Sequence, residues 1–203
     1  MTVTIRSATA ADLGACDEIC LRTGWSGEDA TAYYTDPALL GQVYARPYLL
    51  LPEGIGFVAE DAAGVAGYVL GTPDTRRFEE ACERHWWPAL RARHRDPGTS
   101  SPVGLSPDDR LHALIHRPVP APEEVIADFP AHLHIDLLPR LQGSGTGRVL
   151  IERFLGRLEA AGVPGVHLGV GRANERAVGF YRHLGFTTLL ERPDALVLGH
   201  RLG

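Results

Sequence analysis

The most informative stretch of this chain reads Gln142-Gly143-Ser144-Gly145-Thr146-Gly147, and it joins an apolar segment to an amphipathic one. Its glycines let the backbone come close to a bound anion. A helix that starts here offers unsatisfied N–H groups and the positive end of its dipole to the same anion. The stretch therefore predicts a loop that binds the phosphate groups of a ligand.

Two common phosphate loops do not fit these residues. A mononucleotide P-loop needs a lysine and then a serine or threonine after its last glycine, whereas Arg148 and Val149 follow Gly147. A dinucleotide loop that starts at Gly143 and Gly145 needs a third glycine where Arg148 stands. A glycine turn without function is a third interpretation, but three alternating glycines cost much conformational entropy on folding. Another kind of phosphorylated ligand is therefore the best interpretation.

The segments around the loop predict an α/β (α+β) fold. Strands are expected at residues 3–7, 56–61, 65–71, 132–138, 166–170, 187–191 and 195–199, and helices at 10–22, about 28–44, 146–161 and 174–185. This order predicts a central mixed, twisted sheet of about six to seven strands with helices on both faces.

Residues 72–130 differ in character and are expected to form a helical insertion between the third and fourth strands, within a single domain covering residues 1–203. A helix over residues 76–95 should kink or break at Pro88, because proline cannot continue a helix. We expect Trp86 in the core and Trp87 partly exposed, since neighbouring helical residues point in different directions.

Composition narrows the function classes. The net charge of −5 and the lack of a basic stripe argue against nucleic acid as the main partner. No segment approaches the length of a membrane span, and the first residues do not resemble a secretory signal. The three cysteines form no disulfide framework. We therefore expect a cytoplasmic protein that binds neither nucleic acid nor membrane.

Two motifs, in order and at a suitable distance, resemble the GNAT acetyltransferase superfamily. The first is Q-x-x-G-x-G, met by Gln142, Gly145 and Gly147, and the second is NERAVGFYRHLGF at residues 174–186. The stretches HLHIDLL at 132–138 and LVLG at 196–199 are also similar to the acetyltransferase-like C-terminal region of O-GlcNAcases and its free-standing bacterial relatives. The animal proteins have a degraded glycine loop, whereas the loop is intact here.

The resemblance implies a GNAT fold that binds acetyl-CoA in a V-shaped gap between strands 132–138 and 166–170. The pantetheine arm would pair with the backbone of Leu137 and Leu138 like a short added strand. The pyrophosphate would lie on N–H groups from Gly143 to Arg148, and Gln142 would close the start of the loop. Arg148 either adds charge to a phosphate or is solvated. Asn174 caps its helix and, by the resemblance, also contacts the cofactor arm.

The resemblance also assigns catalytic candidates. Tyr181 would be the general acid that protonates the departing CoA thiolate, with core packing as the alternative role. Asp136 is the first candidate for a base, and His134 and His132 alternate with it on the same strand face. A bulge in this strand would reverse that face. Glu60 is a weaker candidate.

These inferences predict an N-acetyltransferase that moves acetyl from acetyl-CoA to an amine in a ternary complex. The alternatives are a catalytically silent acetyl-CoA-binding or protein-interaction module, and an enzyme for another acyl group. The acceptor is an unidentified small molecule or protein, and a homodimer is possible. We expect the insertion near the acceptor site, with Phe78, Trp87 and Tyr33 as candidates to line it. No metal is expected, because His112 and His116 lack a third ligand.

Overall fold

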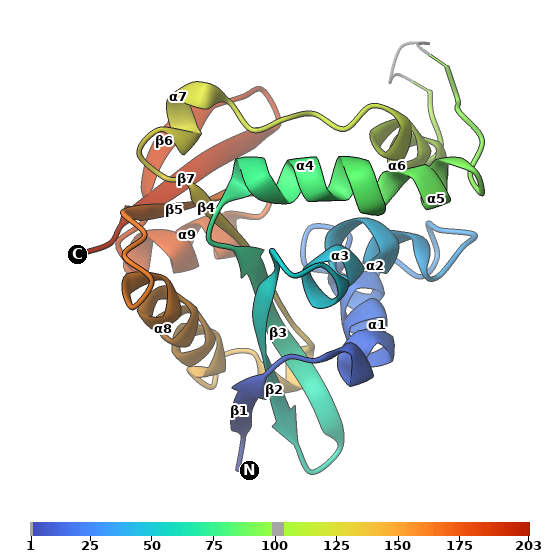
Figure 1. The fold of residues 1–203 in the computed structure, drawn as a ribbon. Helices are drawn as coiled ribbons and strands as arrows, with labels where there is room; N and C mark the ends of the chain where they lie inside the picture. The colour runs from blue at the N-terminus through green and yellow to red at the C-terminus, as the bar shows by residue number, and fades with distance from the viewer. Residues whose placement is uncertain (1, 99–103) are drawn as a thin grey trace.

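A single seven-stranded sheet forms the centre of the molecule, as the computed structural model shows for residues 2–98 and 104–203 (Figure 1). Its strands lie in the order β1-β2-β3-β4-β5-β7-β6. Their bounds are β1 Thr4–Ser7, β2 Ile55–Asp61, β3 Gly64–Thr72, β4 Ala131–Leu137, β5 Gly165–Gly171, β6 Thr187–Glu191 and β7 Ala195–Arg201. Only the β4–β5 pair is parallel, so the predicted mixed sheet is confirmed.

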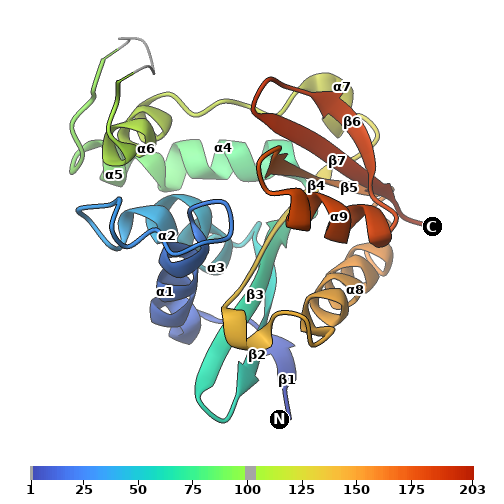
Figure 2. The same ribbon diagram turned by 180° about the vertical axis from the view of Figure 1, so that it is seen from behind.

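Helices cover both faces of this sheet. On one face lie α1 Leu13–Thr23, α2 Leu39–Tyr44 and α3 Arg46–Leu50, and on the other lies α8 Thr146–Glu159 (Figure 1). The inward stripe of α8 consists of Leu150, Ile151, Phe154 and Leu158, which are all fully buried. The helix α9 Glu175–His183 lies beside β4 and β5 (Figure 2). Among the described residues, no helix has both the length and the apolar composition that crossing a lipid bilayer requires.

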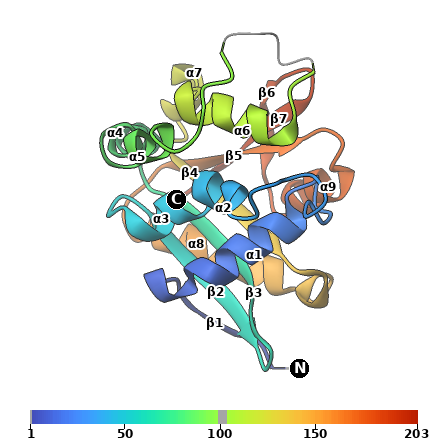
Figure 3. The same ribbon diagram turned by 90° about the vertical axis from the view of Figure 1, so that its right-hand side faces the viewer.

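The predicted helical insertion stands between β3 and β4. It contains α4 Thr75–His85, α5 Trp87–Arg91, α6 Pro107–His116 and α7 Glu123–Ile126. Figures 1 and 3 show α4 and α5 stacked over α2 and α3. The break expected near Pro88 is confirmed, and it explains why the prediction for the two tryptophans was wrong. The helix is interrupted at Trp86, and Trp87 is the buried one while Trp86 is half-buried.

The helix expected over residues 28–44 is shorter than predicted. Only α2 is helical there, and polar side chains hold the preceding residues in turns. Asp29 accepts the N–H of Thr31 at 2.8 Å, and Asp36 accepts that of Ala38 at 2.9 Å. Such local side-chain acceptors compete with helical hydrogen bonding.

The registers at β4 create the opening that matters for function. On one side β4 pairs continuously with β3, from Gly67↔Leu137 to Thr72↔His132, without a bulge. On the other side it pairs with β5 at only Ala131↔Val166 and His132↔His167. Beyond these two pairs the parallel strands separate. The V-shaped gap predicted between these strands is therefore present.

Candidate functional site

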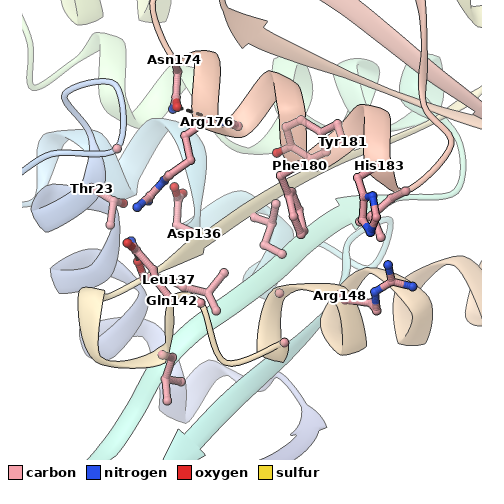
Figure 4. A pocket seen from close by; sticks show the side chains of 18 residues that line it. Thr23, Asp136, Leu137, Gln142, Arg148, Asn174, Arg176, Phe180, Tyr181 and His183 are labelled. Atoms are coloured by element: carbon pink, nitrogen blue, oxygen red, sulfur yellow. Dashed lines mark hydrogen bonds between the residues drawn. The ribbon is translucent and has the colours of Figure 1, made fainter.

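A cavity of about 500 Å³ lies where β4 and β5 separate. Figure 4 shows its walls: β4 contributes Asp136 and Leu137, α9 contributes Phe180 and Tyr181, and Thr23 lies at the end of α1. Nine of the residues predicted from sequence line this cavity: Asp136, Leu137, Gln142, Gly143, Gly145, Gly147, Arg148, Asn174 and Tyr181. Leu138, Ser144 and Thr146 do not line it.

The glycine loop leaves a run of backbone donors unpaired at the edge of this cavity. Gly143 and Gly145 have φ values of 71° and 85°, a left-handed conformation that favours glycine. The N–H groups from Gly143 to Arg148 have no acceptor among the described residues. The last three of these belong to the first turn of α8, where the helix dipole is positive. Six free donors at one helix start form a cradle for an anion.

The side chains of Ser144 and Thr146 shape the loop. Ser144 Oγ donates to the carbonyl of Leu141 at 2.7 Å, so the Thr146 hydroxyl, 2.8 Å away, must donate to Ser144 Oγ. Both hydroxyls are therefore used inside the loop. The contribution of these two residues toward a ligand comes from their backbone N–H groups.

Gln142 fixes the start of the loop to β4. Its Nε2 donates to the carbonyl of Leu137 at 2.7 Å, which agrees with its predicted role. Leu138 differs from prediction. Its N–H donates to Ala66 at 2.8 Å and its carbonyl accepts from Leu141 at 2.9 Å, so neither group is free to pair with a ligand.

The same register identifies the backbone groups of β4 that face the gap. Antiparallel pairing alternates, so a residue that bonds to one neighbour is followed by one whose N–H and C=O point to the other side. Because Leu138 bonds to β3, Leu137 and Ile135 direct their backbone groups toward the gap, and both residues line the cavity. The Leu137 carbonyl already accepts from Gln142, so the groups that face the gap without this bond are those of Ile135 and the N–H of Leu137.

Side chains of α8 and α9 add arginines and a histidine to the cavity lining. Arg148 is about half exposed and makes a 3.6 Å ion pair with Glu152 one turn along α8. Arg176 and His183 line the cavity from α9, and Figure 4 shows His183 beside Arg148. Sequence reasoning missed both α9 residues, although the helical spacing of the second motif places them near its start and end. The guanidinium charges of Arg148 and Arg176 suit a phosphorylated ligand.

Asp136, the predicted base, lies in the wall of the cavity. It is half-buried on β4, and the Tyr68 hydroxyl donates to its Oδ2 at 2.6 Å. Burial raises the pKa of this carboxyl to about 6, and the hydrogen bond from Tyr68 offsets part of the rise. A carboxylate with a pKa just below neutral is ionised at pH 7 and still accepts a proton readily. Glu60 instead pairs with Arg6 at the sheet edge.

Tyr181, the predicted acid, lies in the opposite wall of the cavity. Its ring is 8% exposed on α9 and packs against Phe180 and Phe186. Burial, and then the Asp136 carboxylate, raise the pKa of the phenol above its ordinary value, so it keeps its proton at neutral pH. Among the described residues the Tyr181 hydroxyl has no hydrogen-bond partner. The unpaired polar side-chain atom that is completely enclosed in this part of the chain is His112 Nδ1, so the unpaired Tyr181 hydroxyl is not completely enclosed. The hydroxyl is thus open to the cavity.

Asn174 begins α9, and its Oδ1 accepts the N–H of Ala177 at 3.1 Å. The capping role predicted from sequence is therefore present, and the residue also lines the cavity. Gly27, from the turn after α1, lies near the Asn174 amide. This turn forms one rim of the cavity, which the sequence alone did not indicate.

A second cavity, of about 530 Å³, lies between α2, α3 and the insertion. His132 and His134 line it, so the polar face of β4 serves two cavities. Phe78 and Trp87 also line it, whereas Tyr33 lies elsewhere and stacks on Trp25 with ring centroids 4.1 Å apart. Within the described residues, no three potential metal ligands gather in a binding arrangement.

Comparison with known proteins gives consistent matches. The model of the Acetyltransferase (GNAT) family matches residues 103–186. Protein O-GlcNAcase of Rattus norvegicus is 26% identical over 175 residues, which are 84% of this chain and 19% of the relative. The chain therefore spans about a fifth of the length of that relative.

Solved structures match over almost the whole chain. The crystal structure of SsHAT has a TM-score of 0.88 and 39% identity, and the match covers 99% of this chain and 98% of that one. A GNAT superfamily phosphinothricin acetyltransferase from Sinorhizobium meliloti, in complex with AcCoA, has a TM-score of 0.60 and 20% identity, with 100% and 90% covered. The second match speaks to the fold alone.

Proposed function

This chain belongs to the GNAT family of acetyltransferases, and from that premise we propose that it transfers acetyl from acetyl-CoA to an amine. The observation that carries the proposal is the run of six free N–H groups from Gly143 to Arg148, set beside the gap between β4 and β5. A diphosphate on those donors would aim the rest of the ligand along the gap. A family relative of the same fold was crystallised with AcCoA.

The residues of the first cavity fit the parts of acetyl-CoA. The loop would hold the diphosphate, with Arg148 adding charge. Ile135 and Leu137 would pair with the amide groups of the pantetheine arm as an added strand, and Asn174 stands near the same path. The thioester end would then come between Asp136 and Tyr181. No metal is part of this scheme.

The two catalytic candidates divide the proton transfers between them. Asp136 accepts a proton from the acceptor ammonium, which frees the nitrogen lone pair to form the new C–N bond. Tyr181 gives its proton to sulfur as the C–S bond breaks, so CoA leaves as a thiol. The nitrogen loses its second proton to the Tyr181 phenolate as the intermediate collapses, so the amide is released neutral, and Asp136 returns its proton to solvent. The acyl group passes directly between the two substrates, without a covalent enzyme intermediate.

The remaining assignments follow from this scheme. We place the acceptor, a small molecule or a protein, on the side covered by the insertion of residues 72–130, and treat residues 1–203 as one domain. Cytoplasmic location and homodimer formation stay predictions, as does the strict choice of acetyl over larger acyl groups.

A second candidate function is a catalytically silent module that binds acetyl-CoA or a partner protein. The similarity to the O-GlcNAcase of Rattus norvegicus over 175 residues favours it. This candidate shares the cofactor-binding loop with the enzyme. It differs in needing neither Asp136 nor Tyr181.

Two measurements test the proposal in order. Calorimetry with acetyl-CoA comes first, with Gly145→Ala as the variant that strains the loop and Gly156→Ala as its matched control on the open face of α8. Thiol release with a panel of amines comes second. Binding with thiol release supports the enzyme, and binding without it supports the silent module. Absence of acetyl-CoA binding by the unmodified protein contradicts both.

A further inference from the structure

A chain of hydrogen bonds runs under the second cavity. Thr75 Oγ1 lies 2.6 Å from the carbonyl of Pro130 and 2.9 Å from Nδ1 of His132. Nε2 of His132 lies 2.8 Å from the Tyr48 hydroxyl, which lies 3.0 Å from Nε2 of His134. Tyr48 is held in place by Phe78, whose ring stacks on it with centroids 4.4 Å apart.

The Pro130 carbonyl determines which group donates in every hydrogen bond of this series. A carbonyl oxygen only accepts, so the single hydroxyl proton of Thr75 must go to Pro130. His132 must then donate from Nδ1 to Thr75. Burial, and then His134, hold the pKa of His132 well below its ordinary value, so the ring is neutral and its Nε2 is a lone pair. Tyr48 therefore donates to His132.

This series of hydrogen bonds determines the tautomer of His134. The Tyr48 oxygen has given its proton away and can only accept, so Nε2 of His134 must carry a hydrogen. Burial, and then His167, lower the pKa of His134 to about 4, so this ring is neutral as well. Nδ1 of His134 is therefore unprotonated and carries a lone pair. This protonation state follows from the carbonyl of Pro130, through the three side chains between it and His134.

That lone pair is available to a ligand. Nδ1 of His134 has no partner among the described residues, and it is not among their fully enclosed atoms. Tyr44, Tyr48, Phe78 and Trp87 form aromatic walls of the cavity that His134 lines. Aromatic faces attract organic cations.

The charges of the cavity point to the same class of ligand. Glu79, Glu80 and Glu83 line it together with Arg76. Arg76 pairs with Glu79, and Glu83 pairs with Arg91 from outside the cavity. Glu80 is exposed and has no ion-pair partner among the described residues. The lining therefore carries more negative than positive charge, which suits a cation.

We propose that the second cavity is the acceptor site, that it takes a primary ammonium attached to an apolar or aromatic body, and that this ammonium donates an N–H to Nδ1 of His134. The inference rests on the proposed acetyl transfer for the identity of the ligand as acceptor. Tyr48, His132 and Thr75 are positioning residues in this arrangement, because they act through His134.

The position of His134 on β4 connects this site to the chemistry. His134 and Asp136 are two residues apart on the same strand face, so their side chains stand about 7 Å apart. Two hydrogen bonds of about 3 Å each from one nitrogen span less than this, so the amine binds His134 first and then moves toward Asp136. His134 thereby selects and holds the amine, and Asp136 takes its proton.

The test uses protonated phenethylamine as the probe and 2-phenylethanol as the uncharged control of similar shape. The matched variants are His134→Gln and His134→Asn. Glutamine places its amide near Nε2 and keeps the contact to Tyr48, whereas asparagine places an acceptor near Nδ1. Calorimetry measures probe binding to the full chain, ¹⁵N spectra of the histidines report their tautomers, and acetyl-CoA binding is measured on each variant.

We expect Nδ1 of His134 to be unprotonated in the free protein and to shift when phenethylamine binds. His134→Gln should weaken phenethylamine binding about tenfold or more, as expected for a lost hydrogen bond to a charged group. His134→Asn should retain more of the affinity, and 2-phenylethanol should bind more weakly than phenethylamine. All variants should bind acetyl-CoA like the unmodified protein.

Each contrary result has a distinct meaning. A protonated Nδ1, equal binding of phenethylamine to His134→Gln, or no binding of phenethylamine overturns the inference while acetyl transfer to other amines still stands. If phenethylamine binds at His134 but no thiol is released from acetyl-CoA, the cavity is a cation site and acetyl transfer is overturned. The second cavity is then not an acceptor site.

Discussion

Tyr68 and Asp136 stand opposite each other across the β3–β4 pair, and the Tyr68 hydroxyl donates to Asp136 Oδ2 at 2.6 Å. Tyr68 is fully buried, so its hydroxyl has no alternative partner in water. The bond stabilises the ionised form of a carboxyl that burial makes harder to ionise. Tyr68 therefore controls the pH at which the proposed base becomes active.

Tyr68→Phe should shift the acid limb of the pH–rate profile upward. Removing the donor raises the pKa of Asp136 above its value of about 6, by about one unit for a hydrogen bond to a charged group. Asp136 must be ionised to accept a proton, so activity at low pH should fall while activity at high pH is retained. The measurement is kcat/KM against pH, and an unmoved acid limb would remove Asp136 from the role of base.

Asp136→Asn should lower turnover by about a hundredfold or more, the usual contribution of a positioned base. Acetyl-CoA affinity should stay within about twofold, because the loop that would hold the diphosphate is not altered. Thiol release and calorimetry check the two halves of this prediction. Glu60→Gln is the control, since Glu60 pairs with Arg6 away from the cavity. Retained turnover in Asp136→Asn would favour the silent module.

The same variant should be more stable than the unmodified protein at neutral pH. The folded pKa of Asp136, about 6, lies above the ordinary value of 3.8, so the unfolded chain loses this proton at lower pH. The stability difference between variant and unmodified protein should therefore grow from about pH 4 to pH 6 and then level off. Urea unfolding at four pH values measures it. A difference that does not change with pH would mean that Asp136 is not buried as described.

Tyr181→Phe should lower kcat by about a hundredfold while the Kd for acetyl-CoA changes little, because only the hydroxyl is lost from a packed ring. The defect should be smaller with an acyl donor whose thiol is a better leaving group, since such a donor needs less protonation. Tyr33→Phe is the matched control, because Tyr33 is exposed and stacks on Trp25. Equal turnover in both variants would assign Tyr181 to packing.

Gly145→Ala should weaken acetyl-CoA binding about tenfold. The residue has a φ of 85°, and an alanine there costs about 1–2 kcal/mol or moves the loop and its N–H groups. Gly156→Ala is the control: it lies within α8 with nothing within 4 Å of an added Cβ, so it should add up to about 1 kcal/mol of stability. If both variants bound acetyl-CoA like the unmodified protein, the loop would not be the phosphate site.

Features encoded by neighbouring residues were predictable from the sequence. The left-handed glycines of the loop, the amphipathic stripe of α8 and the cap at Asn174 each depend on a few adjacent residues. The GNAT fold of the whole chain was predicted from the family resemblance. The separation of β4 from β5 followed from the same resemblance.

Features that depend on pairing between distant segments were not predictable. The role of Leu138 depended on its bond to Ala66, and only the register with β3 reveals that Leu137 and Ile135 face the gap. The partners of Asp136 and His134 come from positions 68 and 86 residues earlier. The predicted burial of Trp86 and Trp87 was reversed, because the helix break changes which side chains face the core.

The separation of β4 from β5 also affects how firmly the two parts of the sheet are held together. Two residue pairs alone connect the strands β1–β4 with β5–β7 through the sheet. A ligand arm lying between Leu137 and β5 would connect the two parts of the sheet, because it would supply hydrogen bonds where β4 and β5 do not pair. Ligand binding would then raise the melting temperature of both halves together, by mass action on the folded state.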